Sequence, residues 1–96
     1  MSTAGTWHAD LGSLSFRPEG HEGRCFVHQR AFGTLLGGAS LQADCERYFH
    51  ANSSAFERAA AAKIERARLT SQENFHLNSR DITRELRPPS ASVPGA

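Results

Sequence analysis

The strongest structural signal in the chain reads AFERAAAAKIERARL, from Ala55 to Leu69. Alanine and long unbranched charged residues are the best helix formers, so this stretch predicts a helix. Its predicted buried stripe consists of apolar residues at helical spacing: Phe56, Ala60, Ile64 and Ala67. The small alanines in the stripe allow a sheet or a neighbouring helix to approach closely.

Two shorter helices are predicted before this one. From Gln29 onward, apolar residues recur at helical spacing until Gly37 and Gly38, a glycine pair that is typical of a helix end. After Ser40, a second helix is indicated by four apolar residues on one face: Leu41, Cys45, Tyr48 and Phe49. The segment 81–86 fits either a final short helix or an extended stretch.

Alternating apolar and polar residues predict three strands. Leu14 and Phe16 alternate with serines, which is the pattern of a strand with one buried face. After a loop containing proline and glycine, residues 24–28 resume a β-like run and complete a hairpin, although the consecutive apolar residues Cys25, Phe26 and Val27 leave its register open. Phe75 and Leu77 mark the third strand.

The resulting order, ββαααβ, predicts an α+β fold. A lone hairpin cannot support itself, so the helices must cover one face of the sheet. We expect a small two-layer domain with a mainly antiparallel three-stranded sheet. If Phe26 or Val27 lies on the uncovered face, that face presents an apolar side chain that calls for a partner or a second copy of the chain.

Length and composition bound the domain organisation. The chain has 96 residues, of which 39% are hydrophobic and 22% charged, and this describes one small domain. We predict a flexible tail at residues 1–10, a single domain at residues 11–86 and a disordered tail rich in proline and serine at residues 87–96. Neither a secretory signal nor an apolar run of about 20 residues is evident, so we expect a cytoplasmic protein that does not enter membranes.

The order of these features resembles a family of short bacterial, and specifically proteobacterial, proteins of unknown function. The resemblance covers most of residues 11–81 and rests on aromatic, aliphatic and small residues at matching places, including Phe16, Ala31-Phe32, Phe49, Phe56 and Ile64. It implies a small stand-alone α+β domain. Because the family has no established activity, the resemblance implies no functional residues.

Zinc binding is the first chemical hypothesis, since Cys25 and His28 together with Cys45 and His50 are ligand types that zinc accepts. Residues three apart in a strand point to opposite faces, which separates the first pair. Residues five apart on a helix diverge by roughly 140°, which separates the second pair. We therefore predict two buried free thiols, and neither a metal site nor a cofactor.

An enzyme is equally poorly supported. Glu46 and His50 lie at i and i+4 with Asp44 nearby, which allows an acid/base pair but is also typical of a helix surface. Cys45 lies on an apolar stripe, where a thiol is expected to be inert rather than nucleophilic. We predict no catalytic residues and no enzymatic activity.

Binding functions remain. The net charge of +1 gives the chain no overall field for nucleic acid, yet the alanine-rich helix carries a local excess of positive charge. We predict a non-catalytic protein-interaction or regulatory module with an unknown protein partner or a second copy of itself. The alternative is a nucleic-acid-binding module that uses the basic residues of this helix: Arg58, Lys63, Arg66 and Arg68.

Overall fold

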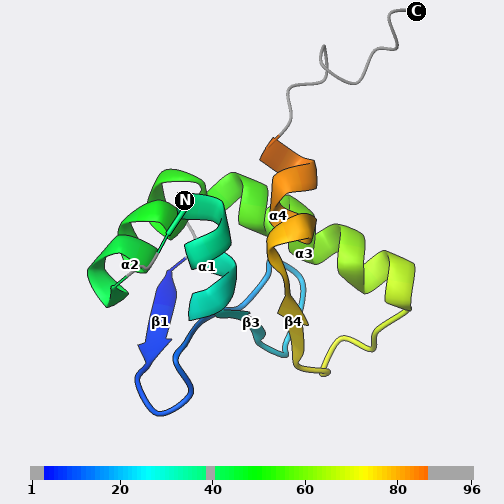
Figure 1. Ribbon diagram of the computed structural model, residues 1–96. Coiled ribbons are helices and arrows are strands. Elements are labelled where there is room, and N and C mark those ends of the chain that lie inside the picture. Colours follow the sequence, from blue (N-terminus) through cyan, green and yellow to red (C-terminus); the bar gives the residue numbers. More distant parts are fainter. Residues whose placement is uncertain (1–3, 39–40, 87–96) are drawn as a thin grey trace, which may run out of the picture.

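The computed structural model describes residues 4–38 and 41–86, so the tail predicted at residues 87–96 lies outside the described residues. In chain order the elements are β1 (Gly5–His8), β2 (Ser13–Phe16), β3 (Cys25–His28), α1 (Gln29–Leu36), α2 (Gln42–Ala51), α3 (Ser53–Ala67), β4 (Phe75–Leu77) and α4 (Ser79–Leu86). The four strands form one sheet in the order β1-β2-β3-β4. The helices lie together on one side of it (Figure 1). The predicted α+β class is confirmed, with segment 81–86 inside helix α4.

The sheet corrects the prediction of three antiparallel strands in two respects. First, residues 5–8, assigned from the sequence to a flexible tail, form strand β1 and pair antiparallel with β2. Second, β4 runs parallel to β3. The chain passes through three helices between β3 and β4 and returns to the starting end of β3, and such a crossover is the connection that parallel strands require.

Backbone contacts fix β4 beside β3. The amides of Glu22 and Gly23 both donate to the carbonyl oxygen of Ser71, at 2.7 and 3.0 Å. The two loops approach so closely at Gly23 that a β-carbon there would clash with the carbonyl oxygen of Glu73. The buried His21 ring adds a hydrogen bond from Nε2 to that same oxygen, at 2.7 Å.

The core lies between the sheet and the helices. Four phenylalanines from four different elements are fully buried: Phe16, Phe32, Phe49 and Phe56. Phe56 on α3 is central, because its ring lies 5.0 Å from that of Phe49 and 5.8 Å from that of Phe32, centroid to centroid. Stacked and edge-to-face rings at these distances stabilise a core beyond simple burial.

Helix α3 follows the predicted stripe only in part. Ala60 is fully buried, Ile64 is partly buried against the core, and Ala67 is exposed. Part of the helix surface is instead taken up by contact with α4, which crosses beside it (Figure 1). The buried stripe of α3 therefore ends about one turn before Ala67, which the sequence had predicted to be its last member.

Candidate functional site

The basic residues predicted on α3 are used mainly to hold α4. The Arg58 guanidinium contacts the Glu85 carboxylate at 3.5 Å and donates to the Glu85 carbonyl oxygen at 3.0 Å. Lys63 Nζ and Arg66 Nη2 both contact Asp81, at 3.6 and 3.3 Å. Positive charge on α3 is therefore matched by acidic residues on the neighbouring helix.

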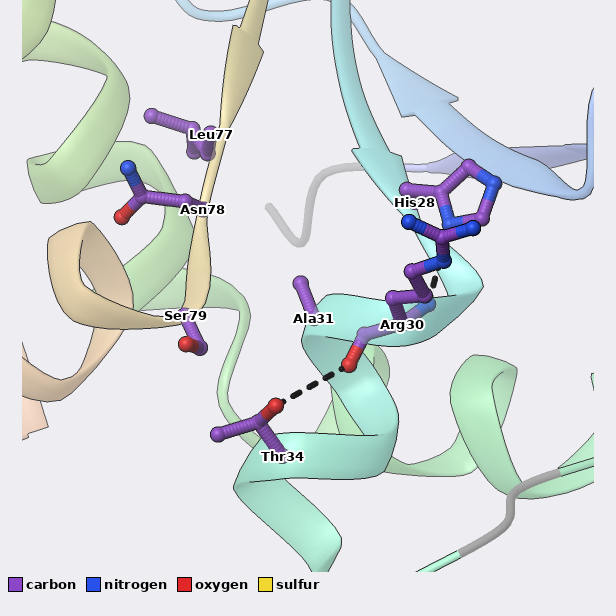
Figure 2. A pocket seen from close by; sticks show the side chains of 7 residues that line it. All are labelled: His28, Arg30, Ala31, Thr34, Leu77, Asn78 and Ser79. Atoms are coloured by element: carbon purple, nitrogen blue, oxygen red, sulfur yellow. Dashed lines mark hydrogen bonds between the residues drawn. The ribbon is translucent and has the colours of Figure 1, made fainter.

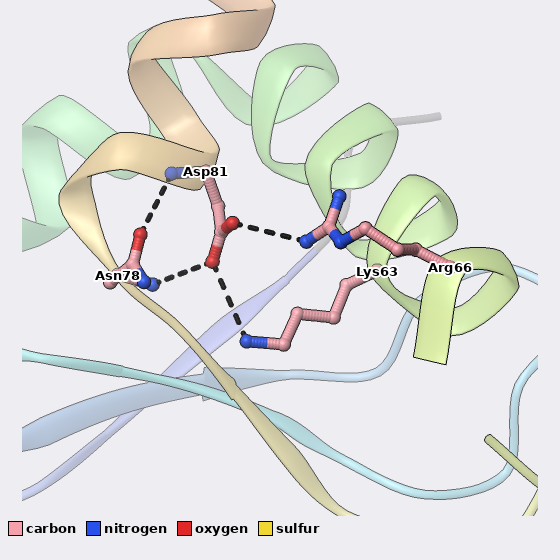
Figure 3. A network of polar contacts seen from close by, with 4 residues as sticks. All are labelled: Lys63, Arg66, Asn78 and Asp81. Carbon is pink, nitrogen blue, oxygen red and sulfur yellow. Dashed lines mark hydrogen bonds and ion pairs between the residues drawn. The ribbon is translucent and has the colours of Figure 1, made fainter. Parts of the chain in front are cut away.

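Asp81 is the centre of this helix-to-helix network (Figure 3). Its side chain is only 7% exposed, and its Oδ2 also accepts the backbone N–H of Asn78 at 3.0 Å. Asn78 Oδ1 in turn accepts the backbone N–H of Asp81 at 2.9 Å, which makes a reciprocal cap at the start of α4. The Asp81 carboxylate thus caps the start of α4 and also contacts two cations of α3.

Arg68, the fourth predicted basic residue, lies at the end of α3 in a left-handed conformation with φ of 55°. It is exposed.

The cysteine and histidine pairs considered for zinc are each divided by the fold. Cys25 lies in the core, whereas His28 is exposed on the other side of the sheet. Burial raises the pKa of the Cys25 thiol, and the Lys63 ammonium opposes this only in part. Cys45 is likewise buried, and His50 is exposed with its ring 5.5 Å from that of Phe49. Within residues 4–38 and 41–86 there is no group of three or more metal-binding side chains suited to an ion.

The acid/base group considered on α2 has local structural contacts. Asp44 Oδ2 accepts the backbone N–H of Leu41 at 3.1 Å, at the start of the helix. The other carboxylate oxygen of Asp44 lies 3.8 Å from the Arg47 guanidinium. Asp44 therefore stabilises the first turn of α2.

A pocket of about 450 Å³ lies where the parallel strands β3 and β4 end and helices α1 and α4 begin. Figure 2 shows it between the start of α1 and residues Leu77 to Ser79. Helix N-termini attract anions. Here, however, His28 Nδ1 accepts the first-turn N–H of Arg30 at 3.0 Å, and Asn78 caps α4 as described above. The polar groups at this pocket serve mainly to begin the two helices.

The side of the sheet away from the helices is more distinctive. Residues directly opposite one another in neighbouring strands project to the same side of a sheet. Leu14 and Val27 are such a pair and are buried under the helices, so the intervening residues face the other way. We call this second side the open face, and its residues from the four strands are Thr6, His8, Ser13, Ser15, Phe26, His28 and His76.

Aromatic rings form a row across the open face. The Phe26 ring lies 5.7 Å from the His8 ring and 5.6 Å from the His76 ring, centroid to centroid. These three residues come from β3, β1 and β4. His8 and Phe26 meet across β2 because that strand contributes only small serines, Ser13 and Ser15, to this side.

A polar anchor lies beneath the ring row. Ser15 Oγ lies 2.7 Å from Nε2 of His8 and accepts a hydrogen bond from Nη1 of Arg24 at 3.1 Å. Ser15 is fully buried, so its hydroxyl fixes both side chains from below. Arg24, which immediately precedes β3, is thereby held over the open face.

The sequence pointed to part of this surface. The sequence left the strand register of residues 25–27 undetermined. In the structure, Phe26 lies on the open face and Val27 lies in the core. The roles of His8, Ser15, Arg24 and His76 were not predicted. The serines alternating with Leu14 and Phe16 were the available signal, because they mark one side of β2 as having no bulky side chains.

Among the described residues, no helix has the length and apolar character needed to span a bilayer. No protein-family model matches the chain, and no curated protein matches its sequence. The fold is similar to the crystal structure of a protein of unknown function from the DUF1488 family of Shewanella loihica PV-4. The two have a TM-score of 0.61 and 18% sequence identity, over 80% of this chain and 92% of that chain. The likeness shows a fold shared with a small bacterial protein of unknown function.

Proposed function

We propose that this protein is a non-catalytic interaction or regulatory module that acts by contact between the open face of its sheet and a partner macromolecule. The observation that carries the proposal is the organised layer on that face. Three rings stand in contact above a strand of serines, and a buried hydroxyl holds an arginine beside them. Phenylalanine and arginine are enriched in binding interfaces relative to the rest of a protein surface.

The environments of the reactive side chains support a role without chemistry. Cys25 is buried and its pKa is raised, so its thiol stays protonated and is a poor nucleophile. The Asp81 carboxylate is engaged by two cations and a backbone amide. His21 is buried and bonded to a backbone carbonyl oxygen.

The α3 surface supports a binding role less well. Three of its four basic residues contact carboxylates of α4, so a polyanion would have to displace those carboxylates. Binding of a polyanion at the open face would not require the α4 carboxylates to be displaced.

Site-specific photo-crosslinking in the cells that encode the protein tests this proposal. A benzophenone amino acid is placed at Thr6, which is exposed on the open face, or at Ala43, which is exposed on α2, in the full chain. We expect a light-dependent adduct from position 6 and none from position 43. Adducts from position 43 alone, or from neither position, would refute the open face as the contact surface.

A further inference from the structure

We infer that the open face binds single-stranded nucleic acid, with bases stacked on the His8, Phe26 and His76 rings and a phosphate contacted by Arg24. This inference rests on the proposed function, because it names the partner of the same surface. It differs from the sequence-based alternative, which placed nucleic acid on α3.

The ring row has the form that base stacking requires. Unpaired bases stack on phenylalanine and histidine rings and on guanidinium planes, and a four-stranded sheet that presents two or three such rings is an effective platform. Here Phe26 has a histidine ring on each side, with interplanar angles of 45° to His8 and 32° to His76. His76 is exposed and the other two rings are half-buried, so successive bases can reach the row from solvent.

Charge is distributed to favour an anion on this side. All ten acidic residues of the chain lie in helices or in loops, and the four strands contain none. The open face instead carries three of the five histidines, and Arg24 is held over it by the bond to Ser15. The whole chain has a net charge of only +1, but the strands contribute no carboxylate to this side of the sheet.

A second copy of the chain fits this side less well. The cores of homodimer interfaces are apolar and depleted of charge. Phe26 is the single aliphatic or phenyl side chain among the open-face residues defined above, and the remainder are hydroxyls and imidazoles. The large apolar side chains that the described residues do expose lie outside the strands: Leu11, Leu36, Leu41 and Leu86.

Fluorescence anisotropy of labelled oligouridine and oligothymidine, titrated with the full chain, tests the inference. We expect binding whose affinity falls about 5- to 150-fold in Phe26→Ala, the range measured for losing one stacked base. Phe26→Leu keeps an apolar side chain but no ring, so it should lose affinity similarly, whereas Phe26→Tyr should retain it. Circular dichroism of each variant shows whether the fold is intact.

The salt dependence distinguishes this surface from α3. Contact with one or two phosphates predicts a slope of log affinity against log salt of about −0.7 to −1.4, whereas four cations on α3 predict about −2.8. Arg24→Gln should weaken binding and make the slope shallower. Arg68→Gln, at the exposed residue that caps the C-terminal end of α3, is the matched control and should leave affinity unchanged.

Two outcomes would overturn the inference. One is the absence of binding to both oligonucleotides at low salt. The other is wild-type affinity in both Phe26→Ala and Phe26→Leu. A preference for oligouridine or for oligothymidine would identify RNA or DNA as the ligand. If no oligonucleotide binds while position 6 yields a protease-sensitive adduct, including one with a second copy of the chain, this inference fails and the proposed function stands.

Discussion

Replacing Phe56 with alanine is expected to lower the free energy of unfolding by about 3 to 5 kcal/mol. Phe56 is fully buried, and its ring contacts those of Phe16, Phe32, Tyr48 and Phe49. The substitution removes the ring on which α1, α2, α3 and β2 converge, and it leaves a cavity that these elements cannot all fill. A loss of this size is a large share of the stability of a small domain.

Urea denaturation of the full chain, followed by circular dichroism, measures this loss. Ile64→Ala is the internal control, because Ile64 lies on the same helix but is only partly buried. It should cost about 1 kcal/mol, near half the value of a fully buried side chain. Equal losses in the two variants, or a loss below about 1 kcal/mol in Phe56→Ala, would contradict the placement of Phe56 at the centre of the core.

Replacing Asp81 with alanine has the second largest expected effect on stability, about 2 to 3 kcal/mol. It removes the carboxylate that caps α4, a contribution of about 1 kcal/mol, and leaves two cations without their partner. The loss stays below that of a fully buried ion pair because the side chains of Lys63 and Arg66 are 29% and 49% exposed and can be rehydrated.

Two further variants divide the Asp81 effect into its parts. Asp81→Asn loses the charge but keeps a side-chain oxygen that can accept the hydrogen bond from the backbone N–H of Asn78. It should therefore lower the free energy of unfolding by less than Asp81→Ala does. Glu85→Gln disturbs only the ion pair with Arg58, whose side chain is 55% exposed, and should cost less than about 0.5 kcal/mol. If Glu85→Gln were as destabilising as Asp81→Ala in the same urea titrations, the central role assigned to Asp81 would be wrong.

Local patterns account for the parts of the fold that were predicted correctly. The alternation around Leu14 and Phe16, and the helical spacing of apolar residues around Phe56, report directly on which side of each element is buried. These signals need only neighbouring residues. They therefore predicted β2, β3, β4 and the first three helices from the sequence.

Strand β1 and the parallel pairing depend on contacts between distant residues. Gly5 packs closely against the Phe49 ring on α2, because a β-carbon added at Gly5 would lie only 3.0 Å from a carbon of that ring. The four residues of β1 are too few to show a clear alternation of apolar and polar residues. The direction of β4 follows from the helices that cross the sheet before it. Neither feature is encoded in the local sequence.

The candidate site was predictable only in outline. The sequence left open whether Phe26 or Val27 lies on the uncovered side of the sheet, and the structure places Phe26 there. Its companions come from β1 and β4, and only the strand register brings His8 and His76 to either side of it. The basic residues of α3 formed a stronger pattern in the sequence, but the acidic residues of α4 that bind them lie in a segment whose structure the sequence left open.

The central claim is that the open face binds single-stranded nucleic acid, and chemical-shift mapping tests it most directly. In ¹⁵N-labelled full chain titrated with oligouridine, we predict that the largest amide shifts occur at Thr6, His8, Ser15, Phe26 and His76, with α2 and α3 little changed. Largest shifts on α3 around Lys63, or no shifts on the open face with either oligouridine or oligothymidine, would contradict the claim.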